Sequence, residues 1–430
     1  MAVNDRVKFI TKRLGERLWV KPLFFCILSI AAVFIAKAAD HMSLDRNIPS
    51  VTADSLEALL AILASSMLVI ATFAVASMVS AYASASNSAT PRSFTLIVAD
   101  DVSQNALSTF IGAFIFSIVA LTAAKNGFFQ EAGLAALFAL MVVVFGVVIL
   151  TFVRWVDKIA RLGRLHESVE KVEMATAAAM KRSRAAPALC GIPAERRRTQ
   201  GKAVHSETVG YVQHIDIETL QAWAEKANGR IAVAALPGTF VEPGRALAYV
   251  THAADDTAEL DLKPVVDAFV IGKYRLFDED PRFGLVALSE IADRALSPGV
   301  NDPGTAITII GSLVRLFVLW TEPKKDSPAP KYDRVEVPVL STRDMFDDAF
   351  RAIARDGAGT VEVMLRLQKA FKALSSRGDS EMHDATLAHS RMALARAEKK
   401  LDLPDDLALV REVASFSRAK STNLNPQENK

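Results

Sequence analysis

Long apolar runs fill the first third of the chain, whereas charged and apolar positions are mixed over the remainder. A helix that crosses a membrane needs about 20 largely apolar residues. Four runs qualify, over residues 23–39, 56–82, 106–124 and 132–153. The pattern therefore predicts an α-helical membrane bundle of four transmembrane helices within residues 23–156, after a basic N-terminal segment over residues 1–22.

The first run has a second interpretation, because a basic segment followed by a short apolar run is also typical of a signal peptide. Ala36-Lys37-Ala38 fits the small-x-small cleavage pattern. Against cleavage, the basic segment is long and three more apolar runs follow. We expect the run to be retained as a spanning helix, and a mature N-terminus near Ala39 would contradict this.

Lysine and arginine near the ends of the runs predict the orientation of the bundle. Six basic residues precede the first run, and a second basic group over residues 154–171 follows the fourth. The two intervening loops, residues 40–55 and 125–131, carry one basic residue each. Since basic flanks stay in the cytoplasm, both the N- and the C-terminus are expected there.

The remainder is expected to be a cytoplasmic α+β domain. It divides into a juxtamembrane helix and linker over 157–201, a β-rich module over 202–276, a mostly helical module over 277–418 and a disordered tail over 419–430. Period-two alternation with Pro and Gly turns marks the β-rich module.

Four further expectations concern single elements of this domain. Residues 187–198 are predicted to be a linker. Val335–Leu340 is predicted to be an edge strand, because Pro338 interrupts it. Residues 343–375 are predicted to form one amphipathic helix. Residues 303–320 are apolar but short for a span and contain Arg315, which favours a buried or interfacial helix.

Composition and motifs exclude several function classes. The 50 basic and 48 acidic residues leave a net charge of +2, which gives no support to nucleic-acid binding. Two cysteines exclude a disulfide scaffold and a four-cysteine metal site. No GxSxG elbow, dinucleotide fingerprint, phosphate loop, HExxH or EF-hand occurs. We therefore expect no catalytic residues, no cofactor and no metal, although a dyad of distant residues stays open.

Three motifs stand in order along the chain. The first is Thr90-Pro91-Arg92, then Asp100, Gln104 and Phe110–Phe114; the second is Gly210-Tyr211-Val212-Gln213-His214-Ile215-Asp216, then Pro237–Val241; the third is Asp280-Pro281-Arg282-Phe283-Gly284-Leu285, then Arg294–Pro303. Together, over about residues 20–375, they resemble the bacterial membrane-protein family catalogued as domain of unknown function 2254. Ser108, Val209 and Glu279 depart from the family pattern. The resemblance implies a multi-pass protein of the bacterial inner membrane with a cytoplasmic domain, and no established activity.

The candidate functional residues come from these motifs. They are Arg92, Asp100, Gln104, Tyr211, Gln213, Asp216, Asp280, Pro281, Ser297, Pro298, Asn301, Asp302 and Pro303. Asp100 and Gln104 are four residues apart, which would place both on one helix face. With Arg92 they form either a polar cluster at a pore mouth or, the interpretation we favour, a lipid anchor beside a helix cap.

The Ser297–Pro303 loop also has two interpretations. In the favoured one, Asn301 or Asp302 caps the next helix, Pro303 occupies its first turn and Gly299 takes a left-handed conformation. In the other, the helix start binds a ligand, and Asp302 makes a cation or a hydroxylated ligand a better guess than an anion.

Acidic residues gather near the third motif, with two histidines upstream. They are Asp278, Glu279, Asp280, Asp293 and Asp302, with His205 and His214. Such oxygen ligands would suit Mg²⁺ or Ca²⁺. The favoured interpretation is an acidic helix start, which interacts well with the helix dipole.

The apolar runs contain no Asp, Glu or Arg near their centres, which argues against a proton-driven transporter. Their hydroxyl residues are expected to pack helices together, or to line an uncharged pore if several chains assemble. The leading hypothesis is a homo-oligomeric channel or facilitator in the lipid bilayer, regulated by a small ligand or ion at the cytoplasmic domain. A non-transporting sensor or scaffold with protein partners is the alternative, and a membrane-associated hydrolase at the Asp280 or Asp302 loops is a distant third.

Overall fold

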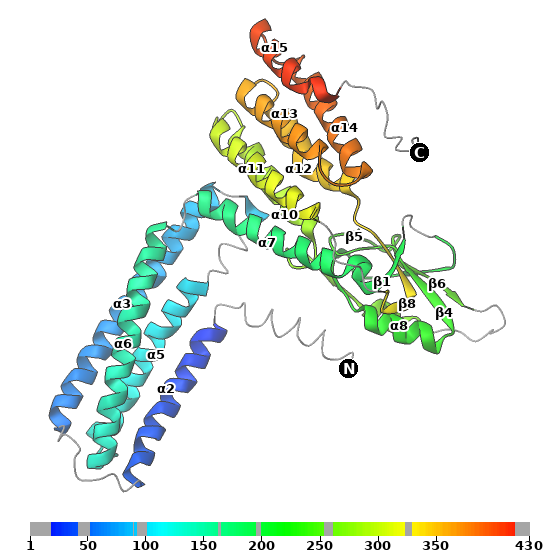
Figure 1. The fold of residues 1–430 in the computed structure, drawn as a ribbon. Coiled ribbons are helices and arrows are strands. Elements are labelled where there is room, and N and C mark those ends of the chain that lie inside the picture. The colour runs from blue at the N-terminus through cyan, green and yellow to red at the C-terminus, as the bar shows by residue number, and fades with distance from the viewer. Residues whose placement is uncertain are drawn as a thin grey trace, which may run out of the picture. The chain divides into compact units, whose positions relative to one another are not determined.

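The computed structural model describes residues 19–41, 52–88, 90–92, 101–161, 165–194, 199–252, 261–322 and 329–417. The chain divides into two compact units. The N-terminal unit comprises residues 4–168, and the C-terminal unit comprises residues 169–430 with residues 1–3. Each unit is described by itself below, with the element labels of Figure 1.

Four long helices form the N-terminal unit. They are α2 (Val20–Ala38), α3 (Ala53–Ser88), α5 (Asp101–Lys125) and α6 (Glu131–Arg161), and the short η1 (Ala39–His41) follows α2. By length and composition, these four and α11 (Pro303–Trp320) are long and apolar enough to cross a membrane, among the residues that the structure describes. The four N-terminal helices coincide with the four predicted apolar runs.

Helix α5 lies at the centre of the N-terminal unit. Its buried positions recur at alternating steps of three and four residues, from Ser103 through Phe110 and Ser117 to Ala124. The hydroxyls of Ser108 and Ser117 donate to the carbonyls of Gln104 and Ala113 on the same helix. Because the hydroxyls are satisfied within the helix and are small, they let the neighbouring helices pack closely.

Asp40 joins the end of α2 to the beginning of α6. Its carboxylate accepts the backbone N–H groups of Gln130 at 3.0 Å and Gly133 at 2.6 Å, and Lys37 Nζ lies 2.9 Å away. Burial acts to raise the pKa of Asp40, but these hydrogen bonds and Lys37 outweigh it and lower the pKa. A carboxylate 90 positions upstream therefore caps α6.

We expect Asp40→Ala to lower the free energy of unfolding by about 1–2 kcal/mol, the usual effect of removing a helix cap. Thermal unfolding of the detergent-solubilised chain measures this. Asp40→Asn retains an acceptor oxygen and is expected to lose less than half as much. Equal losses for the two variants would show that the charge, and not the cap, stabilises this end of the bundle.

Two sheets and a short helix begin the C-terminal unit. The five-stranded sheet has the order β1 (Gly191–Ala194), β8 (Tyr332–Pro338), β4 (Gly229–Val233), β6 (Ala246–His252) and β2 (Lys202–His205). The three-stranded sheet has the order β5 (Phe240–Val241), β3 (Gly210–Ile215) and β7 (Phe269–Gly272). Helix α8 (Ile217–Lys226) packs on β4 and β8, and α9 (Lys263–Asp267) precedes β7.

The two edge predictions for this module were wrong. β8 lies between β1 and β4, with both neighbours parallel to it. Pro338 is tolerated because it ends the strand, beyond Val335 and Glu336, which are the residues paired with β4. Part of the predicted linker, residues 191–194, is the edge strand β1, and residues 195–198 lie outside the described residues.

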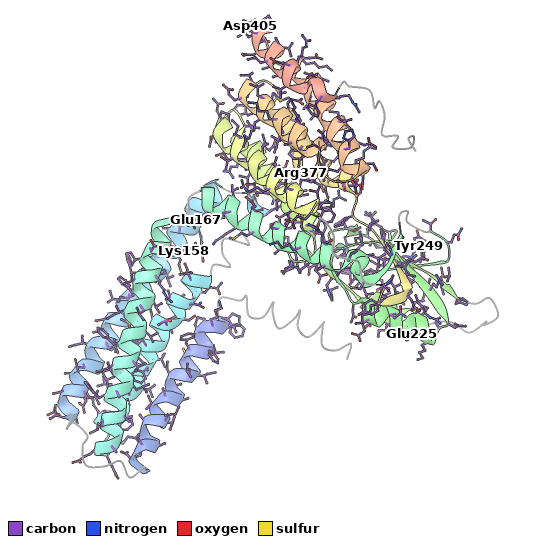
Figure 2. All side chains as sticks on the ribbon, viewed as in Figure 1. Lys158, Glu167, Glu225, Tyr249, Arg377 and Asp405 are labelled. Carbon is purple, nitrogen blue, oxygen red and sulfur yellow. The ribbon has the colours of Figure 1, made fainter. Side chains whose placement is uncertain are left out.

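Helices complete the C-terminal unit. They are α7 (Leu165–Ala185, which begins in the N-terminal unit), α10 (Pro281–Ala295), α11, α12 (Thr342–Asp356), α13 (Val361–Ser375), α14 (Ser380–Ala397) and α15 (Pro404–Val413), followed by η3 (Ala414–Ser417). At the boundary, Lys158 of α6 pairs with Glu167 of α7 at 3.1 Å (Figure 2).

Helix α11 has the buried environment that its sequence predicts. Phe317 is 0% exposed, and its ring lies 4.4 Å from that of Phe346 and 5.6 Å from that of Phe350, both on α12. Arg315 stays at the surface, where it holds Glu173 of α7 through two hydrogen bonds of 2.6 and 2.7 Å. The apolar stripe of α11 therefore packs against the other helices of its unit.

The predicted single helix over residues 343–375 is two helices, α12 and α13. The break follows Gly357, whose N–H donates to the carbonyl of Ile353. A Cβ at Gly357 would lie 2.6 Å from Cγ1 of Val363, so the close return of the chain requires glycine here. The amphipathic pattern continues across the break, and for this reason the sequence alone suggested one helix.

Candidate functional site at the start of helix α10

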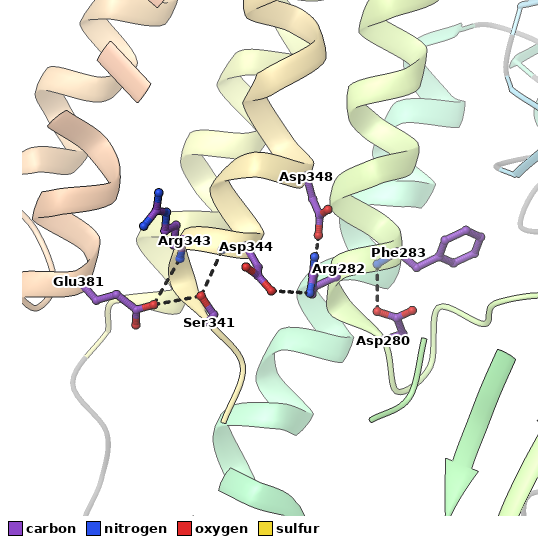
Figure 3. Close-up of polar contacts among 8 residues, drawn as sticks. All are labelled: Asp280, Arg282, Phe283, Ser341, Arg343, Asp344, Asp348 and Glu381. Carbon is purple, nitrogen blue, oxygen red and sulfur yellow. Dashed lines mark hydrogen bonds and ion pairs between the residues drawn. The ribbon is translucent and has the colours of Figure 1, made fainter. Parts of the chain in front are cut away.

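Five consecutive residues, Asp280 to Gly284, begin α10 (Figure 3). Asp280 is the N-cap: Oδ1 accepts the backbone N–H of Phe283 at 3.1 Å, and Oδ2 lies 2.7 Å from Nε of Arg275. Pro281 fills the next position, where a helix has no use for a backbone N–H. Burial raises the pKa of Asp280, although Arg275 and the Phe283 amide act to lower it.

The second motif meets the third at this cap. Gly238 has a φ of 87°, and a Cβ there would overlap Oδ2 of Asp280. The loop is fixed to β3, because Gly238 N donates to the Val212 carbonyl at 2.8 Å and Val212 N donates to the Thr239 carbonyl at 2.9 Å. Only glycine combines this backbone conformation with this close approach.

Strand β3 contributes three of the candidate residues. Gln213 is buried, donates to the carbonyl of Tyr274 at 2.6 Å, and fills the space beside Gly272. Asp216 caps α8, because it accepts from the N–H and the hydroxyl of Thr219. Tyr211 instead lies against Phe240, with ring centroids 5.1 Å apart.

Arg282 and Gly284 connect α10 to two further helices. Arg282 holds Asp348 at 2.5 Å and Asp344 at 2.9 Å, both on α12 (Figure 3). Burial acts to lower the pKa of Arg282, but the hydrogen bond with Asp348 outweighs it and raises the pKa. A Cβ at Gly284 would overlap the side chain of Thr176, so α7 packs directly on this glycine.

The second candidate loop forms a tight turn between α10 and α11. Asp302 is the cap: it accepts from the hydroxyl of Thr305 at 2.6 Å and from its N–H at 3.1 Å, and these bonds lower its pKa. Pro303 begins the helix, as predicted. The left-handed residue is Asn301, with a φ of 49°, and not Gly299 as expected.

The polar groups of this turn are largely used within it. The carbonyl of Ser297 accepts the N–H groups of Val300 and Asn301, and the Ser297 hydroxyl donates to Arg294. The tip of the turn is exposed, from Pro298 to Asn301. The caps of α10 and α11 thus repeat one device, an aspartate followed by proline, but only the turn before α11 is open to solvent.

The first motif contributes less to the described structure. Arg92 is exposed, and Gln104 is buried in α5 at 3% exposure. Asp100 lies outside the described residues, so the predicted pairing of Asp100 with Gln104 on one face stays a prediction.

The predicted acidic set is divided among different partners. Asp278 accepts a hydrogen bond from Arg182 through its carbonyl, Glu279 lies 2.6 Å from Nδ1 of His214, and Asp280 holds Arg275. Within the described ranges, no group of three or more His, Cys, Asp or Glu side chains could hold a metal ion. The cluster acts in the described structure as a set of ion pairs that join β3 and α7 to the start of α10.

Sequence reasoning missed Gly238, Arg275 and Thr176 as parts of this site. Gly238 stood in a quoted motif, but its role depends on a carboxylate dozens of positions away. Chemically, the arrangement interlocks five segments by caps, ion pairs and close glycine contacts.

Comparison with known proteins gives a family and distant relatives. The profile of the family described as "Predicted membrane protein (DUF2254)" matches residues 15–373. An uncharacterized protein of Mycobacterium tuberculosis (strain CDC 1551 / Oshkosh) is 31% identical over 111 residues, which are 24% of this chain and 20% of the relative. A Mycobacterium bovis protein, also named as uncharacterized, matches over the same shares. The chain thus spans about a fifth of these relatives, and no solved structure matches it.

Proposed function

The chain belongs to the DUF2254 family of predicted membrane proteins, and from this premise we propose that it is a channel or facilitator of the bacterial inner membrane. In this proposal α2, α3, α5 and α6 are the four spans, and both ends of the chain are cytoplasmic. Several copies assemble, the conducting path runs between them, and the C-terminal unit regulates it.

The different placement of hydroxyl groups on two helices supports this proposal. Ser103, Ser108 and Ser117 of α5 are buried inside the unit at 0% exposure. In contrast, four hydroxyl side chains of α3 are exposed on the surface of the unit: Ser65, Ser66, Thr72 and Ser80. Since α5 fills the centre, a polar path is supported between copies of the chain, along α3.

The other outward surfaces of the unit suit lipid contact. Helix α2 exposes Phe24 and Ile35, and α6 exposes Val143, Phe145 and Leu150, each by at least half of its surface. Lipid-facing positions are expected to be bulky and apolar, whereas small hydroxyl residues are typical of helix contacts and pores. Helix α3 is therefore the best candidate for a face turned toward other copies.

Flux measured in liposomes tests the proposal. In a Cys26→Ser, Cys190→Ser background, we expect Thr72→Cys to let a water-soluble thiol reagent reduce flux by more than about half, because bulky groups obstruct a narrow pore. Val147→Cys, exposed on α6, is the matched control and is expected to be insensitive. A purified protein that stays silent across ions, pH and membrane tension would contradict the proposal.

The alternative function, a non-transporting sensor or scaffold, is favoured by one surface of the C-terminal unit. Val209, Phe240 and Tyr274 expose 57%, 42% and 64% of their surface around the three-stranded sheet. Exposed aromatic side chains are enriched where proteins bind one another. Crosslinking separates the two functions: a stoichiometric foreign partner favours the scaffold, and a closed ring of identical chains favours the channel. A hydrolase is less supported, because Asp280 and Asp302 both cap helices.

A further inference from the structure

We infer that the path along α3 prefers cations to anions. This inference rests on the function proposed above, and it concerns the outward side of α3 that carries Asp54, Ser65 and Thr72, here named the α3 face. All three side chains are exposed.

The three side chains share one side of the helix. A helix turns about 100° per residue, so Ser65 lies about 20° from Asp54 around the axis, and Thr72 lies in line with Asp54. The small residues Ala58 and Ala76 are exposed within about 40° of the same line. The face therefore consists of a carboxylate, hydroxyl groups and side chains small enough to leave room beside them.

The hydroxyl groups of this face offer oxygen lone pairs. Ser65 Oγ donates its proton to the carbonyl of Ile62 at 3.0 Å, and Thr72 Oγ1 donates to the carbonyl of Leu68 at 2.8 Å. With its proton directed to its own helix, each hydroxyl presents acceptor lone pairs to whatever passes. Cations are stabilised by acceptor oxygens, whereas anions need donors, which these hydroxyls do not supply while the bonds persist.

The charges along α3 act in the same direction. Asp54 and Glu57 are the two charged residues of α3, which contains no lysine or arginine. Copies arranged around a pore would place a ring of Asp54 carboxylates at one mouth, where a negative field raises the local concentration of cations. Asp54 and Thr72 are separated by about 27 Å along the axis, which is close to the thickness of the hydrocarbon core.

Reversal potentials of the purified full-length protein in planar bilayers, under a KCl gradient, test the inference. We expect a potential shifted toward the K⁺ equilibrium value. Asp54→Asn is expected to reduce the K⁺/Cl⁻ permeability ratio by at least about threefold, because it removes the carboxylate ring, whereas Asp54→Glu restores it. Glu57→Gln, about 60° away around the helix, is the matched charge control and is expected to keep the ratio.

Thr72→Val tests the hydroxyl contribution separately, because it replaces the oxygen with a methyl group of similar size. We expect it to reduce the K⁺ current, whereas Thr122→Val, the same change at an exposed hydroxyl of α5 that donates to Ile118, leaves the current unchanged. A current that prefers Cl⁻, or a ratio unaffected by Asp54→Asn, would overturn the inference while the channel stands. The absence of any ion current would instead overturn the proposed function.

Discussion

Gly238→Ala is expected to destabilise the C-terminal unit by roughly 3 kcal/mol or more. A side chain at a φ of 87° costs about 1–2 kcal/mol in backbone strain, and overlap with a packed group adds about 1–3 kcal/mol. The added Cβ would overlap the Asp280 carboxylate, which cannot move without releasing Arg275 and the N–H of Phe283. Denaturant unfolding of the detergent-solubilised chain measures the loss.

Gly244→Ala is the matched control, because a Cβ there meets no atom within 4 Å. It is expected to change stability by less than about 0.5 kcal/mol, as surface substitutions usually do. The double variant Gly238→Ala, Asp280→Ala should lose less than the sum of the single losses, since both act on one contact. Strictly additive losses, or equal effects of the two glycine substitutions, would mean that the loop does not rest on the α10 cap.

Acidification from pH 7 to pH 4 is expected to destabilise the C-terminal unit through His389. The side chain is 4% exposed, its Nε2 lies 3.3 Å from Oδ1 of Asp347, and its ring lies between Phe346 and Phe371. Burial lowers the pKa of His389 to about 4; Asp347 acts against this, while Arg351, Arg396 and Arg343 act with it.

The sign and range of the pH effect follow from this lowered pKa. Above pH 6.5 the imidazole is neutral in both the folded and the unfolded chain, so its full contribution to stability is present. As the pH falls, the unfolded chain binds a proton that the folded chain resists, and stability decreases until the folded pKa near 4 is passed. The loss is on the order of 3 kcal/mol over this range.

Unfolding free energies measured at intervals from pH 7 to pH 4 check this expectation. His389→Gln should remove the steepest part of the profile, even if it lowers stability at pH 7. His383→Gln changes an exposed histidine on the same helix and serves as the control. A His389→Gln profile parallel to that of the parent chain would assign the acid sensitivity to the carboxylates instead.

Local patterns predicted most of the helices. Runs of apolar residues specify the N-terminal helices directly, and the Asp-Pro pairs mark the starts of α10 and α11, because both signals depend on residues close together in the chain. The break between α12 and α13 was not visible in the periodicity. It depends on contact between Gly357 and Val363, which is a matter of how tightly the two helices fold back.

The position of β8 and the interlock at Asp280 could not be predicted, because they depend on distant partners. Nothing in the strand itself shows that β1 will cover its outer edge. Likewise, Arg282 reads as an ordinary residue of an acidic, proline-started helix until Asp344 and Asp348 are placed opposite it. The candidate residues were therefore found as motifs, while the contacts that explain them needed the structure.

The segment from Asp280 to Gly284 also determines where the chain can change length. An inserted residue would rotate everything after it by about 100° and shift it by about 1.5 Å, which would separate Arg282 from α12 and Gly284 from Thr176 together. The turn from Pro298 to Asn301 lacks this restriction, because its tip projects into solvent. A tag or a fluorescent reporter is therefore better inserted at Gly299, where it would follow the C-terminal unit without disturbing its assembly.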